Sequence, residues 1–297
     1  MNFYQISAQS IFFYASYLSI QILVVLIFLA IVKRRALCGN KILMAVYALS
    51  ISATLLFIYS RFIERNLITQ QVTRINTGFE AKIIVISDIH LGVYKDTNFL
   101  KSVVKKINKI KNADAVLIAG DFTYHSGKNL ESLFYPLKDI KFPVYAVLGN
   151  HDSDKTLQKE LQATLENNNV VFLHNSSFPL KENITILGLG DKWTNEDMVS
   201  KIDQFKESDD LIVLTHNPDT VLKYKNNIAD LTIAGHTHGG QIRIPFLYKL
   251  IIPCEGDFDQ GLYSINQNQV FVTSGVGEVG LPMRLGVPPV IDVLELY

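Results

Sequence analysis

Five short apolar runs predict buried β-strands, and they constrain the fold of this chain more than any other feature. Each run is five or six residues long and rich in Val, Ile and Leu, as expected for strands covered on both faces. Segments with helical spacing of apolar residues occur between them, at 96–111, 157–165 and 198–205. Because strands that alternate with helices pair in parallel, the pattern predicts an α/β domain. The five runs occupy residues 82–87, 114–119, 143–148, 211–215 and 230–234.

Four more apolar runs follow towards the C-terminus without helices between them. They lie at 241–244, 261–265, 270–274 and 291–296. Their spacing indicates additional β-structure. We therefore expect two packed sheets flanked by helices.

Residues of the types that bind metal ions follow each of the first five predicted strands. Because the carboxyl ends of parallel strands converge on one edge of a sheet, we expect these side chains to meet. In the stretch 235–240, GHTHGG, the glycines let two imidazoles leave regular strand pairing and face one site. Each motif alone is common, but their coincidence at five successive strand ends predicts a metal centre. The residues are Asp88, His90, Asp121, Asn150, His216, His236 and His238.

This set of motifs resembles that of the calcineurin-like metallophosphoesterase superfamily over residues 82–297. The resemblance implies a four-layer αββα sandwich with a dinuclear metal centre. Mixed imidazole and oxygen donors suit transition metals better than Ca²⁺ or Mg²⁺, with Mn²⁺ favoured and Fe or Zn²⁺ as alternatives. The motifs are Asp88-x-His90, Gly120-Asp121, Gly149-Asn150-His151-Asp152, His216 and Gly235-His236-x-His238.

The same resemblance implies a role for each site residue. Asp121 would bridge the two ions, and His151 would lie over the substrate oxygens and donate a proton or hydrogen bond. Asp152 would orient His151. The remaining ligands to the first ion would be Asp88, His90 and His238, and those to the second would be Asn150, His216 and His236.

Within the superfamily, the chain looks most like a membrane-anchored bacterial branch related to UDP-2,3-diacylglucosamine hydrolases of lipid A synthesis. The resemblance rests on HGGQ at 238–241, IP at 244–245 and GLPMR at 280–284, together with an apolar N-terminal region. The chain departs from the common pattern at Tyr124 and Val290, where acidic residues are frequent. Neither position is a metal ligand, so the departures bear on the subgroup and the substrate more than on hydrolysis.

Two uncharged apolar runs near the N-terminus predict transmembrane helices. Residues 11–32 and 42–60 contain 22 and 19 residues, enough to cross a hydrocarbon core of about 30 Å as helices. Residues 69–80 show no apolar periodicity. We therefore expect a membrane anchor over 1–68, a linker over 69–80 and a phosphoesterase domain over 81–297.

The distribution of charge predicts how the chain is oriented in a membrane and argues against nucleic acid as a partner. Lys and Arg are absent before the first span, four lie between the spans and three follow the second up to residue 80. This favours a cytoplasmic hairpin loop and a catalytic domain on the outer side of the cytoplasmic membrane. Residues 81–297 carry 21 basic against 26 acidic side chains, so a nucleic-acid partner is not expected.

The only cysteines, Cys38 and Cys254, do not indicate a disulfide framework.

These features predict a metal-activated water that attacks a phosphodiester or pyrophosphate, in a lipid-linked substrate such as UDP-2,3-diacylglucosamine. The lipid bilayer is then an expected partner. Two alternatives stay open, namely a non-catalytic metal-binding scaffold and a nucleotide or nucleic-acid phosphodiesterase. The run 242–253, IRIPFLYKLIIP, fits either a core strand with its connection or an apolar lip at the site that admits an acyl chain. A UDP-linked substrate requires a cytoplasmic site, whereas the charge distribution favours the outer side.

Overall fold

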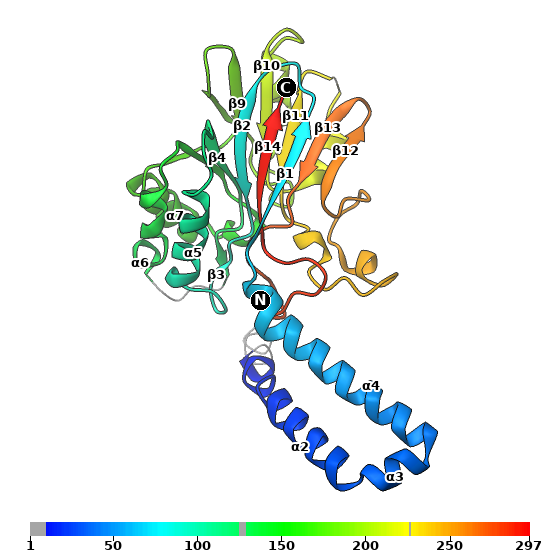
Figure 1. Ribbon diagram of the computed structural model, residues 1–297. Coiled ribbons are helices and arrows are strands. Elements are labelled where there is room, and N and C mark those ends of the chain that lie inside the picture. The colour runs from blue at the N-terminus through cyan, green and yellow to red at the C-terminus, as the bar shows by residue number, and fades with distance from the viewer. Residues whose placement is uncertain (1–9, 125–128, 226) are drawn as a thin grey trace.

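Two six-stranded sheets packed face to face form the body of the protein in the computed structural model, which describes residues 10–124, 129–225 and 227–297. Figure 1 shows the sheets side by side, with the helices α5, α6 and α7 against the first. The first sheet has the order β1 (Thr69–Ile75), β14 (Val290–Leu296), β2 (Ala81–Ile86), β4 (Ala115–Ala119), β6 (Val144–Val147), β7 (Val170–Phe172). The second has the order β12 (Gly261–Ile265), β13 (Asn268–Val272), β11 (Leu231–Ala234), β10 (Asp210–Leu214), β9 (Ile184–Gly188), β8 (Ser176–Pro179).

The five predicted strands that precede site residues are confirmed to within one residue at each end. They are β2, β4 and β6 of the first sheet and β10 and β11 of the second. β2, β4 and β6 pair in parallel, as do β10 and β11, so their carboxyl ends reach the same edge of each sheet. The predicted parallel pairing is therefore confirmed, and it is what brings the site together.

These strands are continuous apolar runs because both faces of the sheet are buried. In β2, Ile84 and Ile86 face the helices, whereas Ile83 and Val85 face the second sheet. The helical layer consists of α5 (Thr97–Ile107), α6 (Leu130–Phe134) and α7 (Lys155–Asn167). The outer face of the second sheet is covered by the short 3₁₀ helices η5 (Val199–Gln204) and η6 (Pro218–Lys223). The layered α/β fold class is confirmed.

One predicted strand is wrong, and three strands were missed. Residues 241–244, predicted as a strand, follow the short 3₁₀ helix η7 (His238–Gly240) and form only an isolated bridge from Ile242 to Leu285. Gln241 has a φ of 51°, which is incompatible with an extended strand. The strands β7, β8 and β9 were not predicted, because they are short and β8 is exposed along its length.

The predicted linker is also wrong, because Thr69–Ile75 is strand β1. It pairs in parallel with β14 from Thr69 opposite Val290 to Ile75 opposite Leu296. Only Ile75 of this strand is fully buried. An edge strand is held largely by backbone hydrogen bonds, so it needs no apolar periodicity and gives no such signal in the sequence. The folded domain therefore begins at Thr69, directly after the N-terminal helices.

The N-terminal region forms a pair of helices that project from this body (Figure 1). The helical stretches Ser10–Val32 and Lys41–Asn66 are 23 and 26 residues long, and both are long and apolar enough to cross a membrane. They include α2 (Leu18–Val32), α4 (Lys41–Ile58), the π-helix η1 (Tyr59–Ile63) and η2 (Glu64–Asn66), with α3 (Arg34–Gly39) between them. Large apolar side chains such as Phe28 and Ile42 are exposed along the pair. This surface suits lipid and not water.

A cluster of buried charges, the junction cluster, joins the end of this helical region to the domain. It consists of Arg65 in η2, Lys95, and Glu278 in the loop after β13. The Glu278 carboxylate pairs with Arg65, and the Lys95 Nζ lies 3.6 Å from it. Lys95 also donates to the Arg65 carbonyl oxygen at 2.8 Å, and the Glu64 carboxylate accepts from the Val287 backbone N–H at 2.8 Å. The N-terminal helices are therefore fixed to the domain and are not flexibly tethered.

We expect Glu278→Gln to destabilise the protein markedly. Removing one partner of a buried ionic cluster leaves the charges of the other partners uncompensated. This typically lowers the unfolding free energy by about 3 kcal/mol. Thermal unfolding of the full chain in detergent measures the change. Glu295→Gln is the matched control, because the ion pair of Glu295 with Arg74 lies at the surface. Equal effects of the two substitutions would contradict the structural role of the junction cluster.

Candidate metal centre

The site is built from five loops that leave the carboxyl ends of β2, β4, β6, β10 and β11. Five of its residues have positive φ angles between 47° and 74°, a region that non-glycine residues rarely adopt. Such backbone strain persists only where the surrounding structure enforces it, and it clusters at functional sites. The five residues are Asp88, His90, Asp121, His236 and His238.

Asp88, His90 and His238 form the first ligand group. All three are buried, and one donor atom of each lies within 4.8 Å of the others. The Nε2 atoms of His90 and His238 are 3.2 Å apart, and the Asp88 Oδ1 lies 3.4 Å from the His238 Nε2. Among the described residues, the Asp88 Oδ1 has no hydrogen-bond partner. A buried carboxylate oxygen without a donor, beside two converging imidazole nitrogens, fits a cation between them.

Asp121, His216 and His236 form the second group, and Asn150 lies beside it. The Asp121 Oδ2 is 3.3 Å from the His216 Nε2, which is 3.1 Å from the His236 Nδ1. The Asn150 Oδ1 is also 3.1 Å from the His216 Nε2. The same Asp121 oxygen lies 3.4 Å from the His90 Nε2 of the first group. Asp121 therefore stands between the two groups, where the sequence placed the bridging ligand.

Backbone carbonyls orient three of the imidazole rings. The His216 Nδ1 lies 2.8 Å from the Ala119 oxygen and the His90 Nδ1 3.2 Å from the Thr123 oxygen. The His236 Nε2 lies 3.1 Å from the Pro253 oxygen. A carbonyl beside one ring nitrogen favours the tautomer with its proton there, so the other nitrogen offers its lone pair to the site.

The burial of the site also keeps two rings in the form that binds metal. Desolvation by burial lowers the pKa of His90 and of His236 to about 3, so both imidazoles are neutral at pH 7. Burial raises the pKa of Asp88 to about 6, with repulsion from Asp121 adding to the effect. Divalent cations would oppose that rise by favouring the ionised carboxylate.

Gly149 shows why glycines surround the ligands. A Cβ atom at Gly149 would lie 2.2 Å from the Asp121 Oδ1 and 2.8 Å from the His216 ring. Any side chain there would displace the central carboxylate.

His151 lies next to both ligand groups but belongs to neither. Its ring packs against His90 with 5.0 Å between centroids and against Tyr124 with 5.6 Å. Its backbone N–H donates to the Asp121 Oδ1 at 2.9 Å. The ring is half-buried and lines the cavity in front of the site. This position suits a proton donor to a substrate oxygen.

The prediction that Asp152 orients His151 is wrong. Its carboxylate accepts from the backbone N–H groups of Phe122, Thr123 and Gly149 at 3.0 to 3.2 Å and from the Thr123 hydroxyl at 3.0 Å. These bonds tie the loop after β6 to the loop after β4, which carries Asp121. Burial, followed by repulsion from Asp121, raises the pKa of Asp152 to about 7. Asp152 is thus a positioning residue for the loops.

A cavity of about 310 Å³ opens in front of the site and is lined by both polar and apolar side chains. Asp121, Asn150, His151, His236 and His238 are polar lining residues, and the apolar lining residues are here called the apolar wall. The apolar wall includes Trp193, whose ring lies 4.5 Å from that of His236. Sequence reasoning did not identify Trp193, because it follows the unpredicted strand β9. The apolar wall is completed by Ile242, Ile251, Pro253, Val279 and Leu281.

A second, larger groove of about 640 Å³ lies elsewhere on the domain, lined by charged residues that include Arg74, Lys82, Lys181 and Glu295. Several of these side chains pair with one another. The groove includes none of the site residues, so we assign the chemistry to the smaller cavity.

Residues 81–240, more than half of the chain, match the family model described as calcineurin-like phosphoesterase. The chain belongs to the calcineurin-like phosphoesterase family. The family uses a dinuclear divalent-metal site, and the two ligand groups fit such a site. The predicted superfamily is therefore confirmed, and the protein is a metal-dependent phosphoric ester hydrolase.

Three relatives illustrate the range of this family. The chain is 31% identical to an uncharacterized metallophosphoesterase of Campylobacter jejuni, over 90% of this chain and 74% of the relative. It is 26% identical to phosphodiesterase YaeI of Escherichia coli, over 72% of this chain and 82% of the relative. It is 28% identical to a transmembrane protein with metallophosphoesterase domain from Danio rerio, over 69% of this chain and 50% of the relative.

Proposed function

We propose that this phosphoesterase is a multi-pass membrane protein that hydrolyses a phosphodiester or pyrophosphate bond in a lipid-linked substrate. The observation that carries the proposal is the composition of the cavity in front of the ligand groups. The cavity is lined by groups suited to metals and phosphate and also by apolar side chains. The two N-terminal helices support a location at a membrane, where a substrate with an acyl chain is concentrated.

Two divalent ions, when bound, supply a water of lowered pKa and neutralise charge on the phosphoryl oxygens. The residues of the two ligand groups, with Asp121 between them, would hold these ions, and we propose Mn²⁺ as the metal, with Fe or Zn²⁺ as alternatives. His151 lies where it can give a proton or hydrogen bond to the departing oxygen. The bonds of Asp152 keep the Asp121 and His151 loops at a fixed separation.

We further propose that the catalytic domain lies on the outer side of the cytoplasmic membrane. Four Lys or Arg residues lie between the helices and none precedes the first, which supports a cytoplasmic hairpin loop. With this topology, the substrate is a lipid-linked phosphate exposed on the outer face. UDP-2,3-diacylglucosamine requires the opposite topology, so reporter fusions at residues 37 and 297 separate the two substrate classes.

Hydrolysis by the full chain in lipid vesicles with Mn²⁺ tests the proposed function. We expect cleavage of a lipid-linked diester or pyrophosphate much faster than cleavage of a soluble diester, because the lipid is delivered by lateral diffusion. Elemental analysis should give two transition-metal ions per chain. Metal without turnover of any phosphodiester would favour the scaffold alternative, and a preference for soluble diesters would favour a nucleotide or nucleic-acid substrate.

A further inference from the structure

The segment Ile244–Ile251, here called the apolar loop, exposes an unusual amount of apolar surface. It has the sequence IPFLYKLI and includes the short helix η8 (Tyr248–Ile251). Phe246 is 93% exposed and Leu250 80% exposed, and Ile244, Leu247 and Ile251 are exposed as well. Single exposed apolar residues are normal in soluble proteins, but several in one short loop mark an interaction surface.

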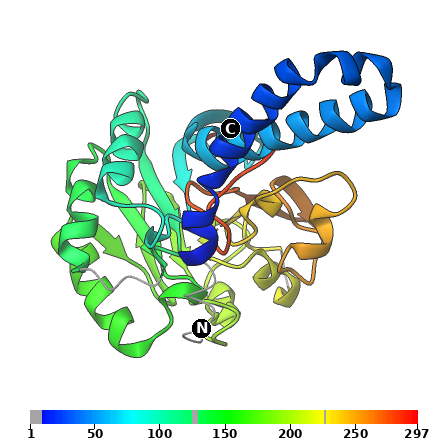
Figure 2. The same cartoon turned by 90° about the horizontal axis from the view of Figure 1, so that it is seen from below.

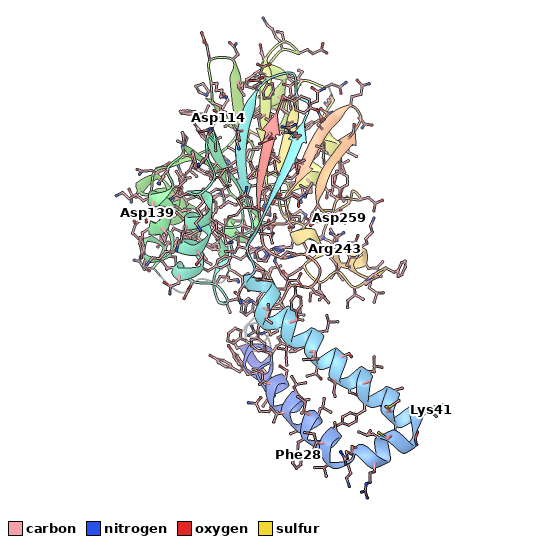
Figure 3. The ribbon with its side chains drawn as sticks, in the orientation of Figure 1. Phe28, Lys41, Asp114, Asp139, Arg243 and Asp259 are labelled. Atoms are coloured by element: carbon pink, nitrogen blue, oxygen red, sulfur yellow. The ribbon has the colours of Figure 1, made fainter. Side chains whose placement is uncertain are left out.

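The base of the apolar loop is held rigidly against the metal centre. The Arg243 guanidinium lies over the Tyr248 ring at 4.3 Å and pairs with Asp259 at 2.6 Å. The Tyr248 hydroxyl donates to the same carboxylate at 3.0 Å. Figure 3 shows Arg243 and Asp259 close together at this edge of the domain. The Tyr248 ring also packs on Gly240, two residues after the ligand His238. These contacts hold the base of the loop in place, and the tip of the loop is exposed.

The apolar loop and the membrane helices lie on the same side of the molecule. In Figure 1 the helices leave the lower end of the domain, and the gold to orange segment at the lower right contains the loop. Figure 2, seen from below, shows both extending to the same side. The junction cluster fixes this arrangement. The tip also carries one cation, Lys249, which suits anionic lipid headgroups.

We propose that the apolar loop inserts into the surface of the bilayer that the N-terminal helices cross. Phe246 and Leu250 then lie among the acyl chains, typically about 5–10 Å below the headgroups for an interfacial element. Ile251 belongs both to the loop and to the apolar wall of the cavity. The loop therefore continues the apolar wall into the bilayer and offers an acyl chain a path to the site. This last step rests on the proposed function, whereas insertion itself does not.

Quenching of tryptophan fluorescence by brominated lipids tests insertion without any assay of activity. The full chain is placed in phosphatidylcholine and phosphatidylglycerol vesicles, with Trp193→Phe to remove its only native tryptophan. One variant adds Phe246→Trp. The matched control adds Val72→Trp, because Val72 is 53% exposed on β1, which runs away from the helices (Figure 1). We expect strong quenching at 246 and little at 72. Equal quenching at the two positions would overturn insertion and leave a protein partner as the occupant of the loop.

Kinetics of Phe246→Ser combined with Leu250→Ser test the link to the substrate. Neither residue lines the cavity. We expect hydrolysis of a lipid-linked diester in vesicles to fall by roughly tenfold, because two polar side chains would replace the apolar surface that leads an acyl chain from the bilayer to the cavity. Hydrolysis of a soluble diester should be unchanged, and Val72→Ser should change neither rate. Equal losses on both substrates would overturn the substrate path. If the unsubstituted protein hydrolyses neither diester, the proposed function fails, and the quenching result still decides insertion.

Discussion

Asp121→Ala is expected to abolish phosphodiester hydrolysis and to remove most of the bound metal. One Asp121 oxygen lies 3.4 Å from the His90 Nε2 and 3.3 Å from the His216 Nε2, so its loss affects both ligand groups. Each divalent ion contributes several kcal/mol of transition-state stabilisation, and every 1.36 kcal/mol is a factor of ten in rate. The rate should therefore fall by at least about 1000-fold. Elemental analysis and diester turnover of the full chain measure the two effects.

Two further variants separate metal binding from folding. Asp121→Asn keeps the size of the side chain and an oxygen that can accept from the His151 backbone N–H, but it removes the charge. We expect it to lose metal and activity while retaining the thermal stability of the metal-free protein. Asp114→Ala is the matched control, because Asp114 immediately precedes β4, whereas Asp121 follows the opposite end of this strand; Figure 3 labels Asp114. Full metal content in Asp121→Asn would contradict the bridging role.

His151→Ala is expected to keep both ions and to lose turnover. The ring lines the cavity but belongs to neither ligand group, so its removal leaves the donor atoms in place. Positioned proton donors typically contribute about 10²- to 10⁴-fold in rate. The loss should be large for a substrate with an alkoxide leaving group and small for a nitrophenyl ester, whose leaving group needs no proton. Turnover of such a substrate pair measures the difference.

This dependence on the leaving group separates proton donation from structural support. A merely structural role for His151 would lower both rates by the same factor. His174→Ala is the control, since His174 is exposed and its ring stacks on Phe172 away from the ligand groups. A loss of metal in His151→Ala as severe as in Asp121→Ala would overturn the assigned roles.

The two candidate ligand groups could be predicted from the sequence because each of their residues follows a strand that is itself a local signal. β2 and β4 are apolar on both faces, so the sequence shows where each strand ends. Asp88 and Asp121 lie within two residues of those ends. The convergence of the ligands then follows from parallel pairing. The same reasoning failed at 241–244, where an apolar run lies over the site in an irregular loop and not in a sheet.

The sequence by itself determined the family, the layered fold and the candidate ligand residues, because runs of apolar residues and adjacent polar motifs are local properties. Only the tertiary structure decided the role of Asp152, whose donors lie about thirty residues away in the Asp121 loop. The same holds for β1, which is recognised as a strand only through its backbone pairing with β14 at the other end of the chain. The junction cluster likewise joins Arg65 to Glu278, 213 residues apart. Each of these features depends on contacts between distant segments, which no local pattern of residues specifies.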